Sequence, residues 1–415
     1  MGSLRGREAA MPFIMVTVLL DMMSIGIIAP VLPKLIGTFM TSGAETSYGY
    51  GAAQAIFCLA QFFSGPVLGA LSDRYGRRPV LLVGLSGMGL NFFVTALAPE
   101  FWMLMAVRLV GGVLCANIAV ANAYVADITA PADRAKNYGM LGAMFGLGFI
   151  LGPVMGGLLA EHDLRWPFYL AGALSLLNGL YGYFVLPESL PQDRRRAFSL
   201  VDANPFAVLG RLRNLQGVGT LMWIMGLSIL AQFCLHSSWF LYTEFKFGWT
   251  PRDNGLSLLV VGGMAVLVQG GLMRQAQKFI PLHRLVILGL VSATLAFAGY
   301  GLVPVGWMIF VVVVANVFGY MIVPGLQSLV ANSVDATRQG ETMGAVSSIN
   351  SVAAVAGPLM GTPLLAAVAG YPPGDWRVGA PFYLCAAIQG VAAFIGLRYF
   401  MSGRYAPEAP PARMA

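Results

Sequence analysis

The chain has 415 residues, of which 57% are hydrophobic and only 10% are charged. This composition excludes a water-soluble globular protein, because too few polar residues are present to cover so large an apolar core. The formal net charge of +7 does not indicate a nucleic-acid partner, since most Lys and Arg residues lie in short segments between apolar runs. Those runs are about 20 residues long, enough to cross a bilayer core of about 30 Å. We predict an all-α, multi-pass membrane protein, since a helix satisfies its own backbone polar groups in lipid.

Residues 1–187 are predicted to form a first bundle of six transmembrane helices. The predicted helices cover about residues 11–35, 48–71, 79–97, 101–127, 137–160 and 167–186.

Residues 188–216 follow as a predicted cytoplasmic linker, because they form the longest stretch without a span and are rich in Arg. Residues 217–401 are predicted to form a second six-helix bundle, and residues 402–415 a disordered cytoplasmic tail. The predicted helices of the second bundle cover about residues 218–242, 253–274, 284–303, 305–332, 342–369 and 380–400.

The two halves repeat each other, which is the main argument for their arrangement. Gly152-Pro153 and Gly156 return as Gly357-Pro358 and Gly361. Because each half has an even number of spans, both copies insert with the same orientation. The twelve helices therefore predict two parallel repeats, with a substrate site near the membrane midplane between them.

Topology follows from the distribution of positive charge. Lys and Arg concentrate in the loops on the side of both termini, which predicts that both termini are cytoplasmic. Arg5 and Arg7 precede a first span without a cleavage site, so this helix is expected to be retained in the cell membrane, as in a bacterial inner membrane. The four Cys residues lie in different apolar segments and predict neither a disulfide framework nor a metal site.

A charged hairpin, residues 69–80, joins the second and third predicted helices. Asp73 stands where its carboxylate can meet the positive N-terminal end of the helix that begins near Thr342, which would latch the two bundles together. The alternative is that these charges only anchor the loop in the cytoplasm. The predicted latch residues are Gly69, Asp73, Arg74, Gly76, Arg77 and Asp127.

Asp21 and Arg108 are the only formal charges predicted to lie well inside spans. Such charges are costly in a membrane and by default indicate a functional site. Their predicted depths are compatible with contact in one aqueous cavity, where Asp21 would carry the coupling proton. A purely structural ion pair is the alternative.

Glycines recur at four-residue steps in the fifth predicted helix. Small residues at this spacing share one face and allow another helix to approach closely, and Pro153 favours a bend. The eighth helix, with Gly262, Gly263, Gly270 and Gly271, is the predicted partner. The packing residues are Gly148, Gly152, Pro153, Gly156 and Gly157.

Three motifs give the chain a family resemblance: the hairpin of residues 69–80, Arg108-Leu-Val-Gly-Gly112, and the glycine pattern around Pro153. Together they resemble the signature motifs of the major facilitator superfamily, and the third is similar to the motif of its drug:proton antiporters. The nearest resemblance is to the tetracycline-efflux branch. It implies that Arg74 or Arg77 bridges to Asp127.

The chain departs from that branch at two positions. Tetracycline exporters carry carboxylates where this chain aligns Asn91 and Ala293. Those acids handle a cationic metal–drug complex and protons, so the departure argues against tetracycline as the substrate and leaves coupling to Asp21.

Polar and aromatic residues within the spans are the remaining candidates for the substrate cavity. For each of them, hydrogen bonding between helices is an equally good explanation. The candidates are Gln54, Gln61, Asn91, Asn117, Phe145, Gln232, His236, Trp239, Asn316 and Gln327.

We therefore predict a monomeric secondary transporter whose partners are a small-molecule substrate, protons and the lipid bilayer. The favoured function is proton-coupled efflux of a small amphipathic organic compound by alternating access. An importer or uniporter of a metabolite, nutrient or metal chelate on the same fold is the alternative. No nucleophile motif or metal-ligand cluster indicates an enzyme, a cofactor or a metal site.

Overall fold

The structure is a computed structural model that describes residues 2–115, 117–129, 134–195, 219–333 and 339–401. Within these residues all the regular structure is helical. The first half comprises α1 (Gly2–Ile28), α2 (Leu32–Gly37), α3 (Gly43–Tyr75), α4 (Arg77–Leu97), α5 (Phe101–Leu114), α6 (Asn117–Ile128), α7 (Arg134–Ala160), α8 (Trp166–Val185) and the 3-10 turn η2 (Gln192–Arg194).

The second half follows the same plan with more interruptions. It comprises α10 (Gly219–Phe247), α11 (Pro251–Leu267), the π-helix η4 (Val268–Leu272), α12 (Met273–Ala276), α13 (Leu282–Leu302), α14 (Trp307–Ala315), η5 (Val317–Met321), α15 (Ile322–Asn332), α16 (Gln339–Val368), η6 (Trp376–Gly379) and α17 (Ala380–Met401).

The prediction of an all-α membrane protein is confirmed. In the described part of the chain, ten helices are long and apolar enough to cross a membrane. The pair α14 and α15, bent by 52°, makes an eleventh if it is one span, and α5 is a shorter apolar helix. The exact count of twelve spans stays a prediction.

Several predicted helices contain irregularities, although residues 11–37 and 251–276 are each long and apolar enough to count as one candidate span. The first is divided between α1 and α2, since Pro30 and Pro33 lie at the division and proline lacks the backbone donor that a helix interior needs. The tenth is divided at Asn316, whose side-chain Oδ1 accepts a hydrogen bond of 3.0 Å from Ser292 Oγ. Asn competes with the helical backbone for hydrogen bonds, which favours such a break. The fourth corresponds to α5 and α6, between which residue 116 lies outside the described part, and the eighth contains η4.

Within each half the closest packing joins the first and fifth helices of the repeat. In the first half, Gly148, Gly152 and Gly156 on α7 lie against the backbone of α1. In the second half, Gly357 and Gly361 on α16 lie against α10. The repeated glycines therefore make equivalent contacts in the two halves.

The eighth helix is a partner of α7 as predicted, but not of every glycine in the set. Gly157 meets the start of α11, whereas Gly148, Gly152 and Gly156 pack against α1 of their own bundle. Sequence spacing shows which glycines share a face, but it does not show which neighbouring helix that face meets. Of the four glycines predicted for the eighth helix, only Gly262 lies close to α7, at the side chain of Ile150.

The two bundles contact each other through a second symmetric set of helices. α7 packs on α11 and α16 packs on α3, so the fifth helix of each half meets the second helix of the other. A Cβ atom at Gly157 would lie 2.5 Å from the carbonyl oxygen of Pro251, and one at Gly255 would lie 2.5 Å from that of Pro153. At Gly51 an added Cβ would overlap Thr362. These positions need glycine because the helices approach so closely.

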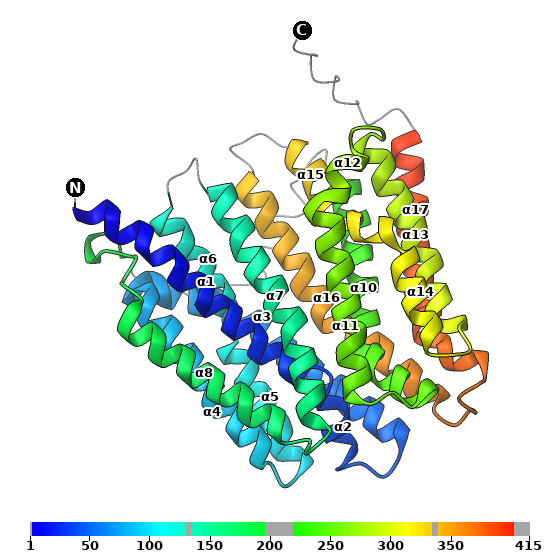
Figure 1. Ribbon diagram of the computed structural model, residues 1–415. Helices are drawn as coiled ribbons and strands as arrows, with labels where there is room; N and C mark the ends of the chain where they lie inside the picture. The colour runs from blue at the N-terminus through cyan, green and yellow to red at the C-terminus, as the bar shows by residue number, and fades with distance from the viewer. Residues whose placement is uncertain (1, 116, 130–133, 196–218, 334–338, 402–415) are drawn as a thin grey trace.

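The inter-bundle contacts lie toward one side of the molecule, which we call the closed side and define by the α7–α8 and α10–α11 turns. There Arg252 Nη1 and Glu161 Oε1 form an ion pair of 3.3 Å between the bundles. Thr250 and Asp253 make a capping box that starts α11 beside this pair. In Figure 1 most helices of the first half lean toward those of the second at the lower end of the view and away from them at the upper end.

We predict that Gly156→Ala lowers the stability of the protein, because its Cβ would overlap the carbonyl oxygen of Ile27 in the neighbouring helix. Overpacking of this kind costs about 1–3 kcal/mol. Gly146→Ala on the same helix is the matched control, since a Cβ there meets nothing within 4 Å. Thermal unfolding in detergent measures both. Equal melting temperatures for the two variants would show that the α1–α7 contact is looser than described.

Candidate functional site

A cavity of about 400 Å³ lies between the two bundles. The first half contributes to it from α1, α3, α4, α5 and α7, and the second half from α10, α11, α13 and α16 among others. Its walls are largely apolar and aromatic, with a few polar side chains, which is typical of sites for small organic molecules. The polar and charged lining residues include Gln54, Arg108, Ser228, Gln232, His236, Gln269, Asn316 and Gln389.

Arg108 is the one Lys, Arg, Asp or Glu among the described residues that line this cavity. Its Nη2 donates a hydrogen bond of 2.8 Å to Gln54 Oε1, and its guanidinium carbon lies 4.5 Å from the centre of the Phe57 ring. The Nε atom is buried and has no hydrogen-bond partner among the described residues. The guanidinium is therefore held in place by α3 while part of it remains unsatisfied.

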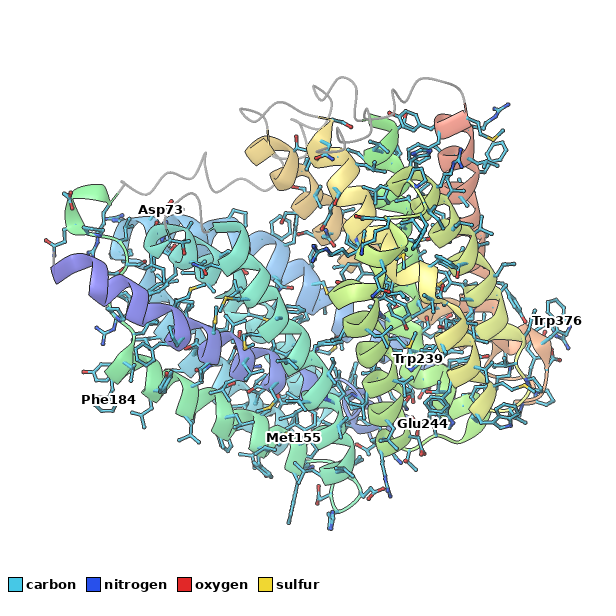
Figure 2. The ribbon with its side chains drawn as sticks, turned by 45° about the horizontal axis from the view of Figure 1, so that its top comes forward. Asp73, Met155, Phe184, Trp239, Glu244 and Trp376 are labelled. Atoms are coloured by element: carbon cyan, nitrogen blue, oxygen red, sulfur yellow. The ribbon has the colours of Figure 1, made fainter. Side chains whose placement is uncertain are left out.

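The second bundle supplies the opposite wall. Gln232 and His236, one helical turn apart on α10, have their side-chain Nε2 atoms 3.3 Å from each other. Trp239, one turn further along, donates from Nε1 to Ser257 Oγ at 3.2 Å, and its ring packs edge-on against Tyr300 at 5.3 Å. Figure 2 shows Trp239 inside the second bundle. This wall is fixed by contacts between α10, α11 and α13.

Asp21 lies in a different cavity, of about 200 Å³, inside the first bundle. Thr17, Asn122 and Phe145 are among its other lining residues. Asp21 is only 7% exposed, and no hydrogen bond or ion pair joins its side chain to a described residue. It is therefore a buried carboxyl group without a partner among the described side chains.

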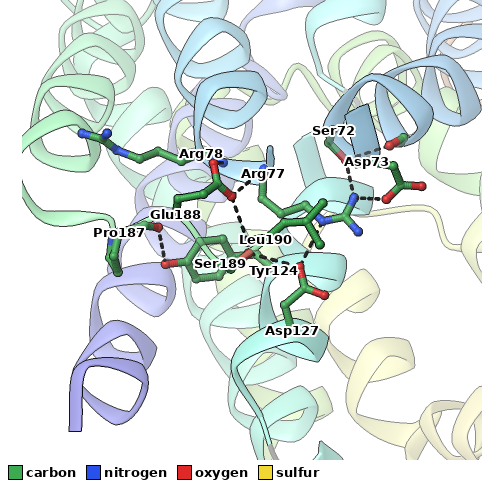
Figure 3. A network of polar contacts seen from close by, with 11 residues as sticks. Ser72, Asp73, Arg77, Arg78, Tyr124, Asp127, Pro187, Glu188, Ser189 and Leu190 are labelled. Atoms are coloured by element: carbon green, nitrogen blue, oxygen red, sulfur yellow. Dashed lines mark hydrogen bonds and ion pairs between the residues drawn. The ribbon is translucent and has the colours of Figure 1, made fainter. Parts of the chain in front are cut away.

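A network of polar contacts surrounds the charged hairpin on the side opposite the closed side (Figure 3). Arg77 forms ion pairs with Asp73 Oδ1 at 2.6 Å, through Nη1, and with Asp127 Oδ2 at 3.1 Å, through Nε. Ser189 Oγ also donates to Asp127 Oδ2 at 3.1 Å. The network therefore joins the α3–α4 hairpin, the end of α6 and the segment after α8 within the first bundle.

Glu188 holds the start of α4 in this network. Its Oε1 accepts a hydrogen bond of 2.9 Å from the backbone N–H of Arg77, and its Oε2 accepts one of 3.3 Å from that of Arg78. A carboxylate at a helix N-terminus is favourable because it meets unpaired N–H groups and the positive end of the dipole. Gly76 precedes the helix with a φ of 106°, and a Cβ there would overlap Glu188. Glycine at position 76 therefore satisfies both the backbone conformation and the close contact.

Comparison with known proteins assigns the family. The sequence pattern of the Major Facilitator Superfamily matches residues 14–358. This chain belongs to that superfamily.

The relatives of this major facilitator protein include several resistance proteins. It is 37% identical to the tetracycline resistance protein, class C, of Escherichia coli, over 90% of this chain and 94% of that protein. It is 28% identical to multidrug resistance protein 2 of Bacillus subtilis (strain 168), over 82% of this chain and 84% of that protein. The predicted resemblance to the superfamily and to its tetracycline-efflux branch is confirmed.

Solved structures share the fold. The human organic anion transporter MFSD10 superposes with a TM-score of 0.69 at 23% identity, covering 94% of this chain and 99% of that one. A bacterial homologue of the human lysosomal transporter Spinster, in an inward-facing and unoccupied conformation, gives a TM-score of 0.74 at 17% identity, covering 97% and 99%. The major facilitator fold predicted from the repeat is therefore confirmed.

The predicted cavity residues of this major facilitator protein divide into several groups. Gln54, Gln232, His236, Trp239 and Asn316 line the cavity between the bundles. Phe145 instead lines the Asp21 cavity. Gln61, Asn91 and Gln327 line neither cavity, and the side chain of Asn117 lies outside the described part of the structure.

The expected contact between Asp21 and Arg108 was wrong for this conformation, because the two side chains enter different cavities. Residue counting had given their depth along the helices, whereas the direction around each helix axis decides which cavity a side chain enters. Of the two predicted bridges to Asp127, Arg77 makes the contact, while the Arg74 guanidinium lies 5.1 Å from the Tyr75 ring. The latch from Asp73 to α16 stays a prediction, since Asp73 pairs with Arg77 of its own bundle here.

Sequence reasoning missed Glu188, Gln269 and Gln389. Glu188 contacts backbone groups about 110 residues earlier, and no local pattern reports such a contact. Gln269 lies in η4, where the local helix geometry is irregular. Gln389 could have been found from its sequence, as it is a lone amide in the apolar run of the last span.

We predict unequal coupling energies for the two ion pairs of Arg77. The Asp127 side chain is 23% exposed and the Asp73 side chain 41%, so the first pair is better shielded from water. Double-mutant cycles on the free energy of unfolding should give about 1 kcal/mol or more for Arg77–Asp127 and under about 0.5 kcal/mol for Arg77–Asp73. The substitutions are Arg77→Gln with Asp127→Asn or Asp73→Asn. A larger coupling for Asp73 would contradict the arrangement in Figure 3.

Proposed function

We propose that this transporter exports a small amphipathic organic compound in exchange for protons, by alternating access of a central cavity to the two sides of the membrane. The observation that carries the proposal is the cavity itself, which both bundles line with aromatic and polar side chains. Its size and apolar walls suit an organic molecule. The resistance proteins named above support export rather than import.

The moving parts would be the two bundles, residues 1–187 and 217–401, joined by the linker 188–216. Their interface supports this division, because its two close helix contacts are equivalent under the internal repeat. Separation of α7 from α11 and of α16 from α3 would open the closed side. Approach of the hairpin to α16 on the other side would bring Asp73 to its proposed latch position at the N-terminus of that helix.

Asp21 is the proposed proton carrier. A carboxylate within a membrane span is costly unless water or a cation reaches it, and the structure gives it no partner among the described residues. Its protonation would therefore follow the access of water to its cavity. That access can change as α1, α6 and α7 move with the first bundle.

With both termini in the cytoplasm of a bacterial cell, the closed side faces outward, and the open side faces the cytoplasm. The protein would act as a monomer in the inner membrane, since one chain supplies both halves of the cavity.

A second candidate is an importer or uniporter of a metabolite or chelate. It is favoured by one observation: no Asp or Glu is found among the described residues that line the cavity, and Ala293, where the resemblance to tetracycline exporters implies a carboxylate, is one of them. The direction of transport in oriented vesicles distinguishes the two candidates.

We predict that Asp21→Asn abolishes uptake driven by a pH gradient into everted vesicles, because a neutral amide cannot release a proton. Asp193→Asn, at an exposed position after α8, is the matched control and should transport like the wild type. Accumulation of a fluorescent amphipathic substrate, with and without an uncoupler, is the measurement. Wild-type accumulation by the Asp21→Asn protein would rule out its proton role, and accumulation only in right-side-out vesicles would favour the importer.

A further inference from the structure

We propose that the compound carried by this transporter is an organic anion, whose carboxylate or comparably acidic oxygen group binds Arg108 while its apolar part lies against the aromatic walls. This inference rests on the proposed function as a transporter, and it names the substrate class of the same cavity.

The first support is the sign of the charge in the cavity. Arg108 is the one Lys or Arg among the described lining residues, and no Asp or Glu is found among them. Asp21 does not supply the missing negative charge, because it lies in the other cavity. An organic cation bound here would meet a guanidinium without a carboxylate to balance it, whereas an anion would meet a complementary charge.

The second support is the incomplete hydrogen bonding of Arg108. A guanidinium has five N–H donors, and the hydrogen bond to Gln54 satisfies one of them. Its Nε is buried without a partner among the described residues. A buried charge is costly unless it is paired and hydrogen-bonded. A carboxylate can supply both the opposite charge and two acceptor oxygens in the geometry that arginine prefers.

A third support comes from the wall formed by the second bundle. Gln389 Nε2 and Ser228 Oγ both belong to residues that line the cavity, and both are buried without a partner among the described residues. The amide nitrogen can only donate, and a hydroxyl can donate. Both atoms have almost no accessible surface in this conformation, so rotation of their side chains into the cavity is needed before they can donate to an acceptor oxygen of a ligand.

The apolar walls define the rest of the ligand. Phe57 and Phe92 lie on the first bundle's side, and Trp239, Phe297 and Tyr300 on the second. Phe57 already lies under the guanidinium, so an aromatic ligand bearing a carboxylate can extend from Arg108 toward the opposite aromatic cluster. A cavity of about 400 Å³ lies within the range of about 300–1,000 Å³ found for drug-sized ligands.

The test compares three probes that share one fluorescent aromatic group: dansylglycine, an anion; its neutral amide, dansylglycinamide; and the cation dansylcadaverine. Binding to the full-length protein in lipid nanodiscs is measured at pH 7.5 by fluorescence, with empty nanodiscs as the blank. Dansylglycine should bind at least about tenfold more tightly than dansylglycinamide, as expected for one charge-assisted hydrogen bond or more. Equal affinities, tighter binding of dansylcadaverine, or no binding of dansylglycine would overturn the proposal.

Variants assign the preference to Arg108. The ratio of interest is the dissociation constant of dansylglycinamide divided by that of dansylglycine. In Arg108→Gln this ratio should fall to about one. In Arg108→Lys it should lie between one and the wild-type value. Arg165→Gln, which removes an exposed arginine before α8, is the matched control and should keep the wild-type ratio. A ratio unchanged in Arg108→Gln would overturn the proposal. If Arg108→Gln does not fold, the ratios measured for the wild type and for Arg108→Lys still test whether Arg108 binds the anion.

These measurements use no gradient, so they are independent of the proton-coupled export proposed above. If gradient-driven accumulation in vesicles fails while the anion preference remains, only the proton-coupled export mechanism is excluded. If gradient-driven accumulation is normal but no anion preference is found, only the assignment of an organic anion as substrate is excluded.

Discussion

The close approach of α7 to α11 and of α16 to α3 determines how the two bundles are placed around the cavity. At Gly157 and Gly255 the backbones of α7 and α11 meet directly on the closed side, and at Gly51 the backbone of α3 meets the side chain of Thr362 on α16. The two contacts are related by the internal repeat. They therefore hold the two bundles in equivalent positions on either side of the cavity. In the proposed cycle, breaking both contacts opens one side as the other closes.

Because Asp21 and Arg108 lie in separate cavities, the proposed proton site and the proposed substrate site would have to be coupled through the helices between them. α1 connects the two cavities, since Asp21 lines one of them and Ile25, one turn later, lines the other. The same helix packs along the glycines of α7, which also forms the inter-bundle contact. Coupling between sites requires an element with two arrangements that both sites influence. Among the described helices, the pair α1 and α7 carries Asp21, lines the cavity between the bundles and forms part of the contact between the bundles.

Much of the fold follows from sequence, whereas only part of the site does. Apolar run lengths and the returning Gly-Pro pattern predicted the membrane class, the repeat and the family. Residue counting gave only expected depths for Asp21 and Arg108 along their helices and could not give their directions around the helix axes, which set them in separate cavities. The break at Asn316 and the contact from Glu188 to the start of α4 depend on tertiary neighbours, and local patterns do not encode those.

Distances between the bundles on the two sides of the membrane show whether the two sides open in alternation. Spin labels at positions 161 and 252 report on the closed side, and labels at 75 and 279 report on the side of the hairpin, with the native cysteines replaced. Distances are measured by pulsed electron paramagnetic resonance at pH 8 and pH 5.5. Besides the population described here, we expect a second one with a longer 161–252 distance and a shorter 75–279 distance. The share of this second population should change with pH in the wild type but not in Asp21→Asn. A single short 161–252 distance at both pH values would contradict alternating access, and so would 161–252 and 75–279 distances that lengthen together.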